Sequence, residues 1–300
     1  MATTKKKLHF NPIAVITGTI LALYVLTMIF SVLWLMSTAL KSVDEYQFGF
    51  ISNGFKNNTL WFPKHGMTFQ NFIRAYKYFY VQTEKGDVYI LEQFGNSLLY
   101  CVGCSFTTTA TCLVMGYASA RFKYKLSGYI YAFVLVTMAL PVVGAMPSEI
   151  RVAEQLNIFG TFHGIWIMRA SFLSMYFLIF YAQFKMIPKD YTEAAKIDGA
   201  SPGAIMMKII VPLAATTTTT VFVLLFISYW NDYQIPRIYL EEHPVAAHGM
   251  YNFVQIPVNE LDSTPYKLAG IVIMALPIVI FYAIFNKKLN VNLSVGGIKG

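Results

Sequence analysis

Long stretches without charged residues alternate along this chain with shorter polar segments. Six of these stretches are about 20 residues long or longer, near residues 13–36, 93–120, 126–148, 164–184, 209–231 and 268–286. About 20 apolar residues cross a bilayer as a helix, and within lipid a helix pairs its own backbone polar groups. Arg169 alone interrupts the fourth stretch. The pattern therefore predicts an all-α, polytopic membrane protein with six transmembrane helices.

The polar segments between these stretches divide the chain into four parts. We expect an N-terminal tail with the first helix at 1–40 and an outer loop at 41–92, which is rich in aromatic and turn-forming residues. Five more helices form a core at 93–286, which contains the polar loop 185–208, and residues 287–300 form a C-terminal tail. The outer loop is expected to fold without forming a separate domain.

Composition and charge support a membrane protein and indicate its orientation. The chain is 56% hydrophobic, its mean hydropathy is +0.51 and its net charge is +8. With six helices, both termini and the loop 185–208 share one side, which carries thirteen basic and three acidic residues, against ten and twelve on the other side. Basic residues accumulate in the cytoplasm, so this side is predicted to be cytoplasmic. The positive charge is thus a topology signal rather than a nucleic-acid patch.

The polar loop is predicted to form two short helices. Asp190 can cap the first helix, and Glu193, three residues later, can complete a capping box. Gly199 suits the left-handed turn that ends this helix. Ser201 can cap the second helix, with Pro202 at its first position, where no N–H is needed.

The same loop carries a motif with fixed spacing. Glu193-Ala194-Ala195 is followed by Gly199, Ile209 and Pro212, with Val211 where the motif has leucine. It resembles the EAA loop of ABC-importer permease subunits. In that family the loop is a coupling helix, which docks in a cleft of a separate ATP-binding subunit.

The motif residues can also be interpreted from their own chemistry, without the resemblance. Ala194 and Ala195 would form a small-residue face that another surface can approach closely, and Glu193 and Asp198 would be charged anchors. The simpler reading is that Glu193 and Asp198 only cap or solubilise the helix of an ordinary cytoplasmic loop.

The resemblance extends over residues 67–300. Residues 67–72, 116–125 and 230–233 resemble segments of carbohydrate-importer permeases, and 296–300 resembles the end of the maltose-type permease. Residues 261–300 resemble the oligosaccharide branch that imports pectin and alginate fragments. The chain departs from the family at Thr216 to Thr220, where members often carry proline, so the kink of the fifth helix stays open. Helical threonines can bond back to their own backbone, and we interpret this run as packing.

The resemblance implies a non-enzymatic permease subunit, in the type I importer fold, in the cell inner membrane with cytoplasmic termini. Its partners would be a second homologous permease in a heterodimer, two ATP-binding subunits, an extracytoplasmic solute-binding protein, an oligosaccharide and membrane lipid. The first expectation for the oligosaccharide is an acidic one, such as an alginate or pectin fragment. The tail residues Gly296, Gly297 and Lys299 would contact the ATP-binding subunits. The chain contains no phosphate-binding loop, so ATP and Mg²⁺ would lie on partners, with no cofactor, metal or catalytic residue here.

A candidate translocation path is predicted in the outer half of the membrane. Arg169 is an intramembrane charge, which is costly and often functional, but a structural ion pair or snorkelling to the outer interface is the favoured reading. Aromatic faces stack on sugars but also form ordinary interfacial belts. The residues assigned to this path are Arg169, Tyr176, Tyr229, Trp230 and Asn231.

Two other functional classes remain open. An ATP-independent secondary carrier or channel would favour inverted repeats or broken helices, and the sequence shows neither. A membrane scaffold fits the composition. Neither class gives the Glu193 loop a role. Cys101, Cys104 and Cys112 lie in apolar runs and are interpreted as small buried hydrophobic residues rather than metal ligands or a disulfide.

Overall fold

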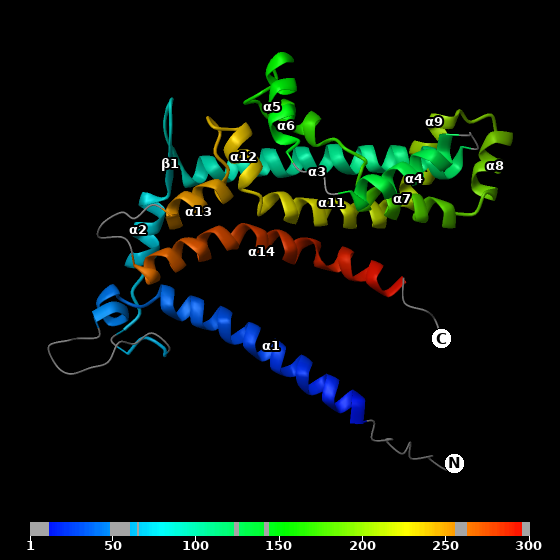
Figure 1. Cartoon of the computed structure of the whole chain (residues 1–300). Coiled ribbons are helices and arrows are strands. Elements are labelled where there is room, and N and C mark those ends of the chain that lie inside the picture. The colour runs from blue at the N-terminus through cyan, green and yellow to red at the C-terminus, as the bar shows by residue number, and fades with distance from the viewer. Residues whose placement is uncertain are drawn as a thin grey trace, which may run out of the picture. The chain divides into compact units, whose positions relative to one another are not determined.

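The computed structural model describes residues 12–48, 61–64, 66–122, 126–140, 144–255 and 263–295. It divides into two compact units. Unit 1 comprises residues 1–78 and 256–273, and unit 2 comprises residues 79–255 and 274–300. The last helix, α14 (Thr264–Val295), runs through both. Figure 1 labels most of the elements named below.

Unit 1 begins with α1 (Pro12–Ala39), whose large apolar side chains are almost all exposed. A short π-helical turn, η1 (Asp44–Phe48), and α2 (Gln70–Tyr78) follow. The buried Asn71 side chain donates hydrogen bonds to the carbonyl oxygens of Ala39 and Lys41, at 2.8 and 2.7 Å. These bonds fix α2 against the end of α1.

A β-hairpin precedes the core helices. Strand β1 (Tyr80–Thr83) pairs antiparallel with β2 (Gly86–Tyr89), with Tyr80 opposite Tyr89. The prediction of an all-α chain is therefore wrong at this point. The alternation of buried Val81 and Val88 with exposed neighbours is a strand pattern, which the aromatic, turn-rich character of the outer loop concealed.

Unit 2 is built around α3 (Ile90–Arg121), which lies beside α7 (Met175–Met186) and α11 (Ala215–Trp230) in Figure 1. Glycine permits the close approach of α3 and α7, because a Cβ on Gly116 would lie 2.8 Å from the Cβ of Phe180. A cluster of buried apolar side chains, including Cys112, Phe180 and Val221, joins the three helices.

Three helices are long and apolar enough to cross a membrane, namely α1, α3 and α14 over residues 264–285, and one bent pair adds a fourth candidate within the described residues. The count of six is not confirmed. The predicted third span, 126–148, contains α4 (Leu126–Ala139), and α5 (Met146–Gln155) begins only at its end. Helix α4 ends two residues before Pro141, as expected because proline disfavours helix at the residue before it.

The predicted fourth span is broken. Helix α6 (Phe162–Arg169) ends, and α7 begins only at Met175. The carbonyl groups that the break leaves without helical partners accept hydrogen bonds from α3. Thr107 Oγ1 donates to the carbonyl of Trp166 at 3.0 Å and Thr108 Oγ1 to that of Arg169 at 2.8 Å. Supplying such bonds from a neighbouring helix is how irregular backbone is tolerated at membrane depth.

The predicted fifth span is bent. Helix α9 (Pro202–Ile205), the π-helical η3 (Met206–Ile210) and α10 (Val211–Leu213) meet α11 at 75°. Thr218, Thr219 and Thr220 donate to carbonyls four residues earlier, at 2.9 to 3.0 Å, as predicted. Two further helices, α12 (Gln234–Tyr239) and α13 (Ala246–Gln255), lie between α11 and α14 in sequence.

Candidate functional site

The polar loop forms α8 (Asp190–Ile197) and α9, but α8 lacks the predicted capping box. Lys189 occupies the N-cap position and makes no side-chain capping bond. Asp190 is therefore the first helical residue, from which its side chain does not cap, and that prediction is wrong. Asp190 and Glu193 still lie in the first turn, where negative charge interacts favourably with the helix dipole.

The end of α8 is formed as predicted. Gly199 has a φ of +78°, in the left-handed region. Its N–H donates to the carbonyl of Lys196 at 3.1 Å, and the N–H of Ala200 donates to that of Ala195 at 2.9 Å. This is a glycine-based helix stop. Ser201 Oγ then accepts from the N–H of Ala204 at 3.3 Å and caps α9, with Pro202 at its first position.

Arg121, the last residue of α3, holds the start of the loop. Its guanidinium donates to the carbonyl oxygens of Ile187 and Pro188, at 2.7 and 3.5 Å. The apolar side of the loop also packs against the core of unit 2, to which it belongs. Ile187, Ile205 and Ile210 are buried there in the cluster around α3 and α7. The orientation of α8 is thus set by contacts at both ends.

The two motif alanines face different sides of α8. Ala195 is 6% exposed and belongs to the apolar cluster of unit 2, whereas Ala194 is exposed. The predicted common alanine face is therefore wrong, because consecutive residues on a helix point about 100° apart. The open face instead combines Ala194 with Tyr191 and Ile197, which are 51% and 87% exposed. Exposed apolar residues of this size are typical of an interaction surface.

The charged motif residues border this open face. Glu193 and Asp198 are both exposed. Neither carboxylate has a hydrogen bond or ion pair with another residue that the structure describes. Pro212 lies further along, within α10, directly before the 75° bend at Ala214. The loop thus presents an apolar strip bordered by two exposed carboxylates, on a helix anchored to the helical core.

Arg169 in the candidate translocation path is paired within the protein. Its guanidinium lies 2.8 Å from a carboxylate oxygen of Glu149 on α5, and the Tyr239 hydroxyl lies 3.4 Å from the same oxygen. The guanidinium is also 5.9 Å from the centre of the Tyr239 ring. These contacts support the structural-pair reading of Arg169 over a substrate contact.

The aromatic residues assigned to the path contribute mainly to packing. The Tyr229 ring meets Tyr100 edge-on at 5.5 Å, and its hydroxyl is 3.2 Å from Thr108 Oγ1. Trp230 is only 3% exposed and stacks on Phe226. Tyr176 is half-buried beside the cluster of unit 2.

Of the path residues, Asn231 alone is exposed, and it donates to the carbonyl of Ile227 at 2.8 Å. Thr108 connects two of the five residues, because its hydroxyl donates to the Arg169 carbonyl oxygen and lies 3.2 Å from the Tyr229 hydroxyl.

Sequence reasoning missed three polar positions that organise this region. Asp232 accepts from the Tyr100 hydroxyl at 2.8 Å and caps α12 through the N–H groups of Gln234 and Ile235. An aspartate two residues before a helix was the available signal. Glu149 was missed because nothing in sequence indicated which acid pairs with Arg169. His248 on α13 is buried, and it lines a pocket beside the β1–β2 hairpin.

The remaining site predictions concern the tail and metal ions. Gly296, Gly297 and Lys299 lie outside the described residues, while α14 continues past residue 286 to Val295. Within the described ranges, no three His, Cys, Asp or Glu side chains gather as metal ligands would. The three cysteines are buried and free.

The sequence matches the family model of the binding-protein-dependent transport system inner membrane component over residues 112–291. This range contains the whole loop from Asp190 to Pro212. Thermoanaerobacterium thermosulfurigenes has a similar protein, a probable starch degradation products transport system permease protein, AmyC. The two are 31% identical over 81% of this chain and 84% of that protein.

The trehalose transport system permease protein SugB of Mycobacterium tuberculosis is 29% identical over 70% of this chain and 78% of its own length. Among solved structures, a bacterial ABC transporter involved in the import of the acidic polysaccharide alginate has a chain with the same fold. Its TM-score is 0.74 at 18% identity, covering 95% of this chain and 99% of that one.

Proposed function

Because the chain belongs to the family of binding-protein-dependent transport system inner membrane components, we propose that it is a permease subunit of an ATP-driven carbohydrate importer. The observation that carries the proposal is the loop at α8. Its motif spacing lies inside the family match, and its geometry presents an anchored helix with an open apolar face. Several relatives are named for sugar transport, including trehalose and starch products.

The proposed assembly contains further subunits. A second homologous permease completes a heterodimer, two ATP-binding subunits supply energy with ATP and Mg²⁺, and a solute-binding protein delivers cargo from outside. The family description itself specifies binding-protein dependence. The absence of a phosphate-binding loop in the sequence supports hydrolysis on a partner. The exposed apolar side chains of α1 are available to lipid and to the second permease.

Helix α8 is the proposed coupling helix. Tyr191, Ala194 and Ile197 would enter the cleft of an ATP-binding subunit, and Glu193 and Asp198 would meet basic residues at its edge. Closure of the ATPases would then move α8, and with it the core cluster into which Ala195 packs. Movement of α8 would therefore be passed to α3 and α7 through packed side chains.

Replacing Glu193 with glutamine tests whether its charge crosses this interface. Since Glu193 makes no capping bond, the change should leave α8 intact. A charge-assisted hydrogen bond is worth about 1.5–3 kcal/mol, so we expect at least about tenfold weaker association with the ATPase. Retention of ATPase subunits on the purified chain, and substrate-stimulated hydrolysis, would be measured. Glu154→Gln, an exposed change on α5, is the control, and equal retention in both variants would remove Glu193 from the interface.

The cargo is proposed to be an oligosaccharide. An acidic one, such as an alginate or pectin fragment, is supported by the sequence resemblance over residues 261–300. The relatives named for trehalose and starch products favour a neutral sugar instead. Uptake of both classes by one reconstituted complex separates the two.

Both termini and α8 are proposed to face the cytoplasm. In a variant lacking the three native cysteines, a cysteine at position 196 should react with a membrane-impermeant thiol reagent only from the cytoplasmic side. Lys196 is exposed on α8. A cysteine at Lys85, in the hairpin turn, should react only from outside. Labelling of position 85 from the cytoplasm alone would contradict the charge-based orientation.

The broken span between α6 and α7 favours one alternative, an ATP-independent carrier, because interrupted helices are typical of secondary transporters. In this chain, however, the break is filled by side chains of α3 and by the Arg169–Glu149 pair. Family membership and the anchored α8 loop support the ATP-driven reading.

A further inference from the structure

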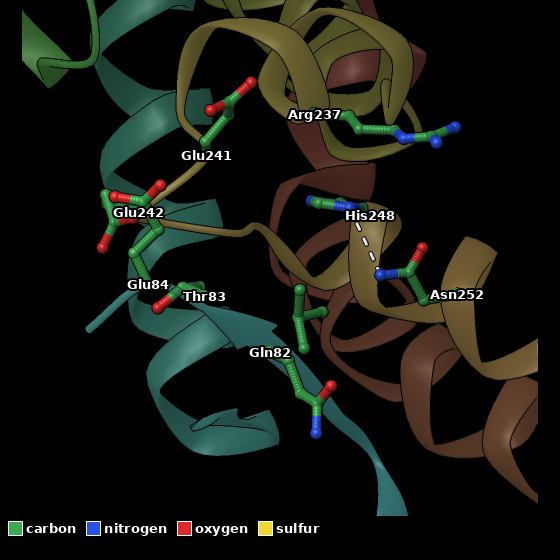
Figure 2. A pocket seen from close by; sticks show the side chains of 9 residues that line it. Gln82, Thr83, Glu84, Arg237, Glu241, Glu242, His248 and Asn252 are labelled. Carbon is green, nitrogen blue, oxygen red and sulfur yellow. Dashed lines mark hydrogen bonds between the residues drawn. The ribbon is translucent and has the colours of Figure 1, made fainter. Parts of the chain in front are cut away.

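A polar pocket of about 520 Å³ lies in unit 2, where the β1–β2 hairpin meets the turn after α12 and the start of α13. None of its residues belongs to the coupling loop or to the candidate translocation path. Figure 2 shows carboxylates at one side of the pocket and the side chains of Arg237, His248 and Asn252 at the other. In the proposed topology this pocket opens outside the cell.

The deepest polar group of the pocket is His248, which is 7% exposed. One ring nitrogen, Nε2, lies 3.4 Å from the amide nitrogen of Asn252, while Nδ1 is buried without a hydrogen-bond partner among the described residues. Burial, with a smaller contribution from Arg237, lowers the pKa of His248 to about 4, so its ring is neutral at ordinary pH. A buried, unpaired nitrogen is unfavourable, and a ligand that bonds to it removes that cost.

The lining offers opposite hydrogen-bonding groups on its two sides. Glu84, Glu241 and Glu242 present acceptors, and of these only Glu242 has an ion pair within the described part of the chain, with Lys85 at 3.8 Å. Arg237 presents donors, with its guanidinium over the Tyr251 ring at 4.8 Å. The amides of Gln82 and Asn252 offer both kinds of group.

Because acceptors line one side of the pocket and donors line the other, some classes of ligand fit it better than others. A basic side chain of a partner protein only donates, so it would satisfy the carboxylates and be repelled by Arg237. A simple anion would satisfy Arg237 and be repelled by the carboxylates. A hydroxyl group both donates and accepts, so it can bond to either side, and it can accept from Nδ1–H of His248, whose Nε2 accepts from the Asn252 amide.

We propose that this pocket binds a sugar residue of a saccharide through its hydroxyl groups, and so forms an extracytoplasmic saccharide site on the permease itself. The assignment of the ligand as transported cargo rests on the proposed function. The site would hold a saccharide after the solute-binding protein releases it. Its volume lies within the range of about 300–1,000 Å³ that is usual for small-molecule pockets.

The test measures direct binding to the complete transporter, purified with its partner subunits but without the solute-binding protein. Maltotriose, arabinotriose and an alginate trisaccharide serve as probes in saturation-transfer NMR. At least one should bind saturably. Glu241→Gln and His248→Phe should each weaken that binding about tenfold or more, by removing an ionised acceptor and a buried nitrogen.

Glu92→Gln is the matched control, because Glu92 is exposed on α3 and does not line the pocket. Should His248→Phe fail to fold, Glu241→Gln decides alone, since Glu241 is exposed and its loss leaves packing unchanged. Binding of no probe, or binding that Glu241→Gln leaves unaltered, overturns the proposal. ATP-driven uptake by the same wild-type complex is scored separately, so that failure of the pocket and failure of the transport function are distinguished.

Discussion

Replacing Gly199 with valine should abolish ATP-driven transport while the chain still inserts in the membrane. At a φ of +78°, an L-residue is disfavoured by roughly 1–2 kcal/mol, and β-branching raises the cost further. The backbone can avoid this cost only by giving up the bonds from Gly199 to Lys196 and from Ala200 to Ala195. Helix α8 would then lose its fixed exit into α9. Uptake by reconstituted vesicles, with insertion checked by protease protection, measures the effect.

Two control variants separate the effect of backbone conformation at residue 199 from the effect of side-chain size. Asparagine tolerates the left-handed region, so Gly199→Asn should retain much of the transport. Gly203 lies in α9, where its φ is not positive and where an added Cβ would meet no atom within 4 Å apart from its chain neighbours and its own helix backbone. Gly203→Val should therefore be nearly silent. Full transport by Gly199→Val would show that the turn does not set the coupling geometry.

Tryptophan substitutions at the two motif alanines should fail for different reasons. Ala194 is exposed on the open face, so Ala194→Trp should leave the chain folded while reducing ATPase retention at least tenfold, because the bulk separates the docking surfaces. Ala195 is buried in the core cluster, so Ala195→Trp should overpack it, at a cost of about 1–3 kcal/mol or more. Co-purification of ATPase subunits and the thermal unfolding midpoint together distinguish the two effects.

The expected pattern is a low retention with a wild-type midpoint for Ala194→Trp, and a lowered midpoint for Ala195→Trp. If Ala194→Trp retained the ATPase fully, the open face of α8 could not be the docking surface. If Ala195→Trp had a wild-type midpoint, Ala195 would not be packed against the core as the structure has it.

Local chemistry made parts of the loop predictable from sequence. Gly199 and Ser201 act through bonds to residues within four positions, so their roles follow from residue type and spacing. Charge-free runs also located the three helices that are long and apolar enough to cross a membrane, namely α1, α3 and α14. The capping box failed because α8 already includes Asp190 as its first residue, and the preceding Lys189 takes the N-cap position.

Features that depend on distant contacts could not be predicted. The side on which Ala195 is buried depends on how α8 packs against helices from elsewhere in the chain. The partner of Arg169, Glu149, is 20 residues away on another helix. The break after Arg169 is tolerated because Thr108, 61 residues earlier, bonds to the freed carbonyl. The hydropathy pattern shows the apolar residues on both sides of the break, but it contains no sign of the break itself.

The direct test of the central claim is solute uptake by vesicles that contain the complete complex, with and without ATP on the side that α8 faces. The account predicts that uptake requires the solute-binding protein and hydrolysable ATP, and that it stops with a non-hydrolysable analogue. Uptake at full rate without ATP, driven by a solute or ion gradient alone, would contradict the account and identify the chain as part of a secondary carrier or channel.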